Sequence, residues 1–281
     1  MTADPVTSLI DAALAEDIGP GDITTDLLIP AAAAGVGTII AKEELVVAGL
    51  DVARRVFARL DSRVRFDPAR ADGDAVAAGT SVAALRGPLR ALLTGERTAL
   101  NFLQRLSGIA TQTRAYVSAL GDRRTVLVDT RKTTPGWRYL EKYAVRVGGA
   151  KNHRMGLFDG VLIKDNHIAV SGGIQAAVQR ARSGASHLLR IEVEVESLPE
   201  VDEALAAGAD VIMLDNMDLA AIRAAVARIA GRATVEVSGG VTDEGLAALA
   251  DAGVDLISSG ALTHSARSVD LSMRITHDSD P

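Results

Sequence analysis

The chain has 281 residues, 48% of them hydrophobic, and a formal net charge of -6. This length allows one large or two medium domains, each with its own apolar core. The acidic charge argues against a nucleic-acid-binding surface, and no apolar run reaches the roughly 18 residues of a membrane span. The absence of cysteine excludes disulfides, thiolate metal sites and a cysteine nucleophile. Because the start lacks the basic region of a secretory signal, we expect a cytoplasmic protein.

Residues 1–108 contain short helical and strand-like patterns without a fixed period. Strands are predicted at 36–41 and 45–47 and a helix at 52–60, so this part is predicted to be a mixed α and β domain. It ends in a longer helix, predicted at 94–106, whose leucines are available for packing.

From Val126 onward the pattern becomes repetitive. Runs rich in Val, Ile and Leu alternate with Ala-rich helical stretches, which is typical of parallel βα units whose sheet is buried on both faces. The strand-like runs lie at 126–128, 161–163, 191–195, 211–214, 235–237 and 256–258. One or two more strands are predicted near 110–116 or 152–157, so an incomplete barrel and a closed eight-stranded barrel both remain open. The tail, 268–281, is predicted to return to the first domain.

Polar residues follow these strands at their carboxyl ends, where parallel α/β barrels carry their active sites. They are Thr130, Arg131, Lys132, Lys164, Glu194, Asp215, Ser238, Ser259 and Gly260. His153 and Arg154 add two more basic side chains between the first two strands. Cations beside buried strands favour a pocket for an anionic ligand. The alternative for these residues is that they cap helices or lie on a solvated face. For Asp215, a role as a helix cap explains the sequence as well as a role in the site does.

Two carboxylates and two loops complete the predicted site. The alternating segment 192–196 places three carboxylates on one face of a strand, where they need cations or a metal as partners. Because Mg²⁺ prefers few carboxylates together with phosphate oxygens, Glu194 and Asp215 are predicted to bind Mg²⁺ shared with a phosphate ligand. The small-residue loops at 238–240 and 259–260 are predicted to offer backbone N–H groups to a terminal phosphate.

Arg97 is unusual because it follows the predicted helix cap, Thr94, by only three residues. A positive charge in the first turn opposes the helix dipole by about 0.3 to 1 kcal/mol. A compensating ligand and a harmless solvated arginine both remain open.

Most of these residues lie in segments that resemble the quinolinate phosphoribosyltransferase family along nearly the whole chain. The matching segments are 16–19, 21–25, 95–101, 130–136, 148–154, 163–167, 192–194, 214–216 and 237–240. The resemblance implies an α/β fold of two domains. These are an N-terminal open α/β sandwich at 1–108, joined by the tail 268–281, and an incomplete, about seven-stranded parallel α/β barrel at 109–267. It also implies a homodimer or larger homo-oligomer with active sites shared between subunits.

Members of this family join quinolinate to 5-phosphoribosyl 1-pyrophosphate with Mg²⁺, giving nicotinate mononucleotide, pyrophosphate and CO₂ in NAD biosynthesis. The resemblance implies catalytic roles for Lys132, Lys164, Glu194 and Asp215. The substrate-binding residues that it implies are these four with Arg97, Thr130, Arg131, His153, Arg154, Ser238, Gly239, Gly240, Ser259 and Gly260. Within that set, the arginines and His153 suit the dicarboxylate, the lysines suit phosphates, and Arg97 would come from the neighbouring subunit.

Three other functions remain open. A related phosphoribosyltransferase would act on a different ring acid. A Schiff-base aldolase would use Lys164 as its nucleophile. A non-catalytic sensor of phosphorylated sugars would bind 5-phosphoribosyl 1-pyrophosphate and release no CO₂ from quinolinate.

Overall fold

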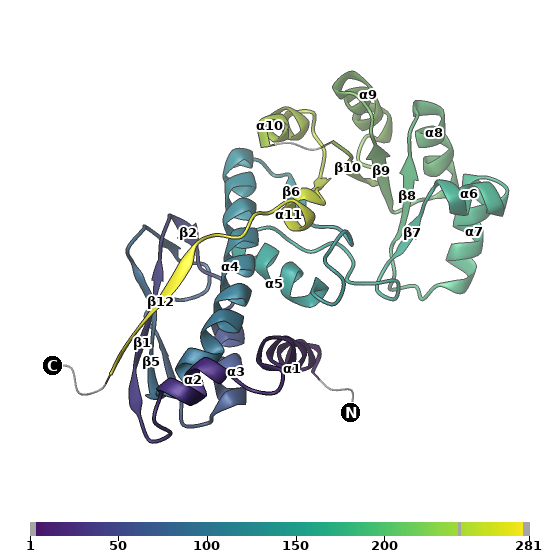
Figure 1. Cartoon of the computed structure of the whole chain (residues 1–281). Coiled ribbons are helices and arrows are strands. Elements are labelled where there is room, and N and C mark those ends of the chain that lie inside the picture. Colours follow the sequence, from purple (N-terminus) through teal and green to yellow (C-terminus); the bar gives the residue numbers. More distant parts are fainter. Residues whose placement is uncertain (1–3, 241–242, 278–281) are drawn as a thin grey trace. The chain divides into compact units, whose positions relative to one another are not determined.

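The computed structural model describes residues 4–240 and 243–277 and contains two compact units (Figure 1). Unit 1 comprises residues 4–114, 134–149 and 265–277, and unit 2 comprises residues 115–133, 150–240 and 243–264. The predicted domain boundary between residues 108 and 109 lies inside a helix. Residues 134–149, which we predicted to belong to the barrel, group with unit 1.

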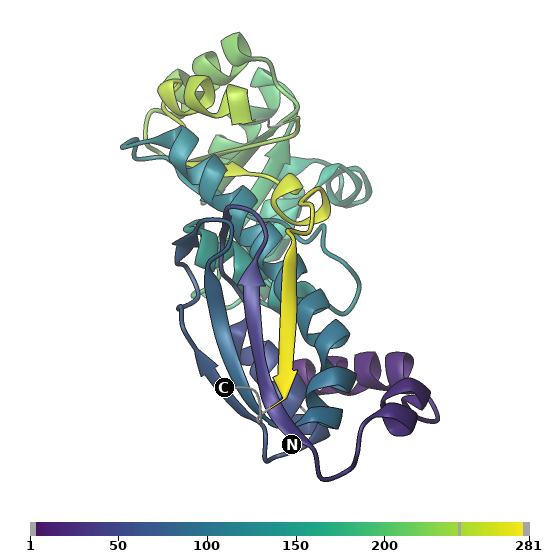
Figure 2. The same cartoon turned by 60° about the vertical axis from the view of Figure 1, so that its left-hand side comes forward.

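Unit 1 is built around an antiparallel sheet with the strand order β12-β1-β5-β3. The strands of unit 1 as a whole are β1 (Ala34–Ala41), β2 (Leu45–Val46), β3 (Arg65–Pro68), β4 (Ala75–Val76), β5 (Ser81–Pro88) and β12 (Leu271–His277). Its helices are α1 (Pro5–Ile18), α2 (Ile23–Leu28), α3 (Leu50–Leu60), α5 (Arg138–Gly148) and most of α4 (Leu89–Leu120). Figure 2 shows β12, in yellow, alongside β1, in purple. The two strands are antiparallel, and Leu271 pairs with Ala41. The C-terminal tail therefore completes the sheet of unit 1.

Helix α4 differs from its prediction at both ends. It begins at Leu89, directly after β5, and runs for 32 residues, so Thr94 lies inside the helix and is not its cap. It also passes through Gly108, where a Cβ would lie 1.9 Å from the backbone oxygen of Arg267 and only glycine leaves room for the contact. Arg97 thus lies in the third turn, away from the unbonded N–H groups of the first turn. The predicted conflict of Arg97 with the helix dipole is wrong.

Unit 2 is built on a parallel sheet with the strand order β6-β11-β10-β9-β8-β7. Its strands are β6 (Val126–Val128), β7 (Val161–Ile163), β8 (Ile191–Val195), β9 (Val211–Asp215), β10 (Thr234–Ser238) and β11 (Leu256–Ser258). Its helices are α6 (Asp165–Ser171), α7 (Ile174–Gly184), α8 (Leu198–Ala207), α9 (Leu219–Ile229), α10 (Asp243–Asp251) and α11 (Ala261–His264). The predicted α/β fold class is confirmed. None of the helices in the described part of the chain is long and apolar enough to cross a membrane.

The predicted additional barrel strands are absent at both proposed places. Residues 110–116 lie in α4, and residues 152–157 form no strand. Instead, Lys151 makes a single parallel bridge to Val128 at the edge of the sheet. Two residues further along the chain, the backbone N–H of His153 bonds to a side chain and cannot extend a ladder. Among the described residues the sheet order begins at β6 and ends at β7, so the barrel is incomplete there, with six strands and one bridge.

Candidate active site

A cavity of about 530 Å³ lies in unit 2, where side chains from the ends of its six strands converge. The predicted site residues that line it are Thr130, Arg131, Lys132, His153, Arg154, Lys164, Glu194, Asp215, Ser238, Gly239 and Gly240. Leu162, Met213, Asn216, Glu236 and Ser258 line it as well and were not predicted. Ser259 and Gly260 do not line it, and Arg97 belongs to unit 1. Most of the predicted residues therefore share one cavity.

Two arginines line this cavity from different loops. Arg131 follows β6 and Arg154 follows the bridge at Lys151, and both side chains are half-buried. Burial lowers the pKa of Arg154, and the nearby charge of Arg131 lowers it further. Two carboxylates, Glu192 and Asp159, act in the opposite direction. An anion bound between the two guanidinium groups would therefore stabilise their charged forms. Their paired N–H donors suit a carboxylate.

A buried carboxylate fixes the segment that carries His153 and Arg154. Asp129, directly after β6, is fully buried. Its Oδ1 accepts the backbone N–H of His153 at 2.9 Å, and its Oδ2 accepts the side-chain amide of Asn152 at 2.6 Å. The backbone N–H of Asp129 also donates to the carbonyl of Lys151 at 3.2 Å. Because a buried carboxylate is stable only with such partners, Asp129 ties this segment to the end of β6.

The acidic residues predicted to bind Mg²⁺ lie on neighbouring strands. Glu194 forms an ion pair with Lys164, and its side chain is only 13% exposed. Asp215, at the end of β9, is half-buried and accepts the side-chain amide of Asn216 at 2.8 Å. Asp218 caps α9, so the interpretation of Asp215 as a helix cap is wrong.

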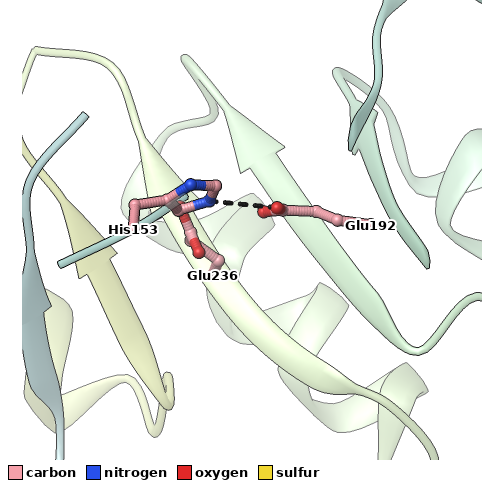
Figure 3. A group of neighbouring side chains, drawn as sticks. All are labelled: His153, Glu192 and Glu236. Carbon is pink, nitrogen blue, oxygen red and sulfur yellow. Dashed lines mark hydrogen bonds and ion pairs between the residues drawn. The ribbon is translucent and has the colours of Figure 1, made fainter. Parts of the chain in front are cut away.

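Three side chains from β8, β10 and the segment before β7 meet below the strand ends: Glu192, Glu236 and His153 (Figure 3). Nε2 of His153 lies 3.0 Å from a carboxylate oxygen of Glu192 and 3.7 Å from one of Glu236. Nδ1 accepts the backbone N–H of Arg154 at 2.8 Å, which places the proton of the neutral imidazole on Nε2. A nitrogen that carries a proton cannot bind a metal, so this hydrogen-bond pattern favours a proton over a metal ion in the cluster.

Glu236 is the residue of this cluster that the sequence analysis missed. Burial, together with the neighbouring charge of Glu192, raises the pKa of Glu236 to about 7, and His153 acts in the opposite direction. One carboxylate oxygen of each glutamate is buried without a hydrogen bond in the described part of the chain. The signal was present in the sequence, because a glutamate between Val235 and Val237 in a buried strand needs an explanation.

The two small-residue loops differ from each other. Ser238, Gly239 and Gly240 line the cavity, and the two glycines have φ of 91° and 59°. A Cβ at Gly239 would lie 2.2 Å from Oδ1 of Asn216, so only glycine allows this approach. Ser259 is buried, and its N–H donates to a carbonyl of β6 at 3.0 Å. That N–H is not available to a phosphate, contrary to the prediction for this loop.

Models of two protein domains match the chain along most of its length. The quinolinate phosphoribosyl transferase C-terminal domain matches residues 109–274, and the N-terminal domain of the same name matches residues 22–107. The chain belongs to the quinolinate phosphoribosyltransferase family. The family predicted from the sequence is confirmed.

Individual relatives agree with this family membership. The chain is 48% identical over 261 residues to a probable nicotinate-nucleotide pyrophosphorylase (carboxylating) of Bacillus subtilis, covering 93% of this chain and 90% of the relative. It is 39% identical over 286 residues to quinolinate phosphoribosyltransferase (decarboxylating) 1b of Nicotiana tabacum, covering 95% and 81%. The crystal structure of NadC from Streptococcus pyogenes matches with a TM-score of 0.94 at 46% identity, over 99% of each chain.

The role of Asp129 leads to a prediction about stability. In Asp129→Asn, an amide N–H₂ group replaces the oxygen that accepts the hydrogen bond from Asn152, so two donors face each other. We expect the free energy of unfolding to fall by about 1 to 3 kcal/mol. The double variant Asp129→Asn with Asn152→Asp exchanges donor and acceptor and should recover at least half of this loss. Urea unfolding measures both, with the exposed Asp122→Asn as the matched control. A double variant as unstable as the sum of its single variants contradicts the proposed contact.

Proposed function

We propose that this enzyme transfers the phosphoribosyl group of 5-phosphoribosyl 1-pyrophosphate to quinolinate, releasing pyrophosphate and CO₂ and forming nicotinate mononucleotide. The observation that carries the proposal is one cavity with two guanidinium groups, Arg131 and Arg154, and two ammonium groups, Lys132 and Lys164. Both substrates are polyanions, so each needs cations of its own. Family membership and the names of the relatives support the same reaction, which belongs to NAD biosynthesis.

Quinolinate is proposed to bind between the two arginines. Its adjacent carboxylates match the forked donors of Arg131 and Arg154, whose charges disfavour each other without an anion. His153 lines the same cavity, and its ring nitrogens bond to Glu192 and to a backbone N–H. We therefore assign His153 to the wall beside the pyridine ring, and its predicted contact with a carboxylate stays a prediction.

The phosphoribosyl substrate is proposed to bind along the other strand ends. Lys132 and Lys164 offer compact positive charges to phosphate oxygens. The loop with Ser238, Gly239 and Gly240 would receive the 5-phosphate, with Gly260 beyond it. Glu194 and Asp215, together with Thr130, would contact the ribose hydroxyls.

Mg²⁺ is part of the proposal. The donor set fits, because Mg²⁺ takes one or two carboxylates together with phosphate oxygens, and Glu194 and Asp215 line the same cavity as the lysines. When bound, Mg²⁺ supplies charge neutralisation for the leaving pyrophosphate.

Charge placement explains how these residues would promote the transfer. Departure of pyrophosphate leaves positive charge on the ribose carbon, which the carboxylates of Glu194 and Asp215 would stabilise. Lys132 and Lys164 would neutralise the leaving group, and the ion pair with Glu194 holds Lys164 in place. The arginines would hold the ring nitrogen of quinolinate in line for attack on that carbon. No covalent nucleophile is needed.

The alternatives have weaker support. A Schiff-base lysine must present an uncharged amine, whereas Lys164 forms an ion pair with Glu194. A sensor of phosphorylated sugars does not need the paired arginines, and a different ring acid would need to carry two anionic groups to use them.

We also propose a homodimer or larger homo-oligomer with shared active sites, working in the cytoplasm. Arg97 is exposed on α4 in unit 1, which suits a residue that reaches another subunit. Large apolar side chains are exposed in both units, as expected of surfaces that another copy covers. They are Ile23, Leu27 and Leu28 in unit 1, and Leu157, Phe158, Val170 and Leu188 in unit 2.

The first prediction concerns the reaction and its dicarboxylate. The purified protein with Mg²⁺, quinolinate and 5-phosphoribosyl 1-pyrophosphate should form nicotinate mononucleotide and CO₂. Arg131→Lys keeps the charge but loses the fork, so the KM for quinolinate should rise about 10- to 100-fold while the KM for the phosphoribosyl substrate stays nearly constant. Steady-state kinetics with each substrate varied in turn measures the two KM values separately. If no product forms at every substrate concentration tested, the proposed reaction is wrong.

The second prediction concerns the shared site. Arg97→Ala and Lys164→Ala should each be inactive as pure proteins. If Arg97 acts in the neighbouring subunit's site, mixing them under subunit exchange should restore up to about a quarter of the parental activity, because half the dimers are mixed and each carries one intact site. The control mixes each variant with itself. If the exchanged mixture stays inactive, the site is not shared in this way.

A further inference from the structure

Glu236 is a buried carboxyl group for which the proposed phosphoribosyl transfer has no use. Its side chain is about 1% exposed, yet it lines the cavity together with Arg131, His153 and Arg154. Its Oε1 is buried and accepts no hydrogen bond from the described residues. A carboxylate in such a place is costly, so Glu236 is stable there mainly as the protonated acid.

The proposed reaction needs an acid at this point. Quinolinate carries carboxylates on C2 and C3 of the pyridine ring, whereas nicotinate carries one on C3 only. When the bond from C2 to its carboxylate breaks, CO₂ leaves and the electron pair stays on C2, beside the ring nitrogen that now carries positive charge. Nicotinate mononucleotide has hydrogen on C2, so the enzyme or water must deliver a proton there.

We infer, resting on the proposed function, that Glu236 is the catalytic acid that protonates C2 after CO₂ leaves. The O–H bond of its carboxyl group breaks, the electron pair remains on the carboxylate, and the proton forms the new C–H bond. A proton from water then restores the acid, so each turnover consumes one solvent proton.

The surroundings of Glu236 suit this role. The pKa of Glu236 is raised to about 7 by burial and by the neighbouring Glu192, which keeps the acid protonated close to neutral pH. Arg131 and Arg154 hold their protons too tightly to act as acids. His153 directs its Nε2–H toward Glu192 and accepts a hydrogen bond at Nδ1, so its proton is already engaged.

A second cavity offers a path for reprotonation. It has a volume of about 490 Å³, lies beside the amino ends of the strands, and is lined by Glu192, Glu236, His153 and Arg154 among others. Glu236, His153 and Arg154 line both cavities. Glu236 therefore touches the proposed quinolinate site on one side and a separate cavity on the other.

The test measures pyrophosphate and CO₂ in the same reaction, using the full chain with Mg²⁺ and both substrates. The parent should release them in equal amounts. Glu236→Gln keeps the shape and loses the acid, so the carbanion at C2 recombines with CO₂ before it can be protonated. Pyrophosphate should still be released in the first turnover, while net CO₂ release and nicotinate mononucleotide formation should be at least about 100-fold slower. The carboxylated intermediate, quinolinate mononucleotide, should accumulate and can be separated by chromatography. A purely structural role for Glu236 would slow both products together.

Controls make the result decisive. Glu196→Gln, at an exposed position after β8, should behave like the parent. Glu236→Asp keeps an acid on a shorter side chain and should restore part of the CO₂ release, and it replaces Glu236→Gln as the test if that variant does not fold. Equal release of both products by Glu236→Gln at the parental rate overturns the role of Glu236 alone. A parent that releases neither product contradicts the proposed function, and this inference with it.

Discussion

The buried carboxylate of Asp129 is the constraint on which the proposed quinolinate site, between Arg131 and Arg154, depends. Arg131 follows Asp129 by two residues after the end of β6, and the segment bonded to the side chain of Asp129 presents His153 and Arg154. These two parts of the chain form only one β bridge, at Val128, so no ladder of backbone hydrogen bonds holds them together. A charged side chain with strong hydrogen bonds replaces the missing ladder and sets the spacing of the two guanidinium groups. At this edge of the sheet, the neighbouring segment is therefore held by a side chain rather than by strand pairing.

Charge is distributed in two levels in unit 2. Cations lie at the strand ends, where the substrates of the proposed reaction bring several negative charges. Two carboxyl groups, Glu192 and Glu236, lie one level deeper, where burial and the nearby charge of Glu192 raise the pKa of Glu236. In the proposed reaction the substrates balance the charge of the cations, and a proton neutralises Glu236. The same cavity can therefore bind dianions and still contain a weak acid beside them.

Sequence patterns predicted the elements and the chemistry better than the connections between them. The runs of Val, Ile and Leu located all six strands of unit 2 because buried parallel strands are continuously apolar. Helix α4 was predicted too short at its amino end because Thr94, a residue type that often caps helices, lies inside the helix. Residues at strand ends were predicted because the ends of parallel strands converge. Glu236 was missed because its partners, Glu192 and His153, are distant in sequence and only the register brings them together.

A crystal structure of the enzyme with quinolinate bound is the most direct test of the proposed site. One carboxylate should lie within about 3 Å of a guanidinium nitrogen of Arg131 and the other equally close to Arg154. C2 of the ring should lie nearest to Glu236, and the ring nitrogen should face the side of Lys164 and Asp215. Quinolinate bound outside this cavity, or inside it without contact to either arginine, would show that the proposed site is wrong.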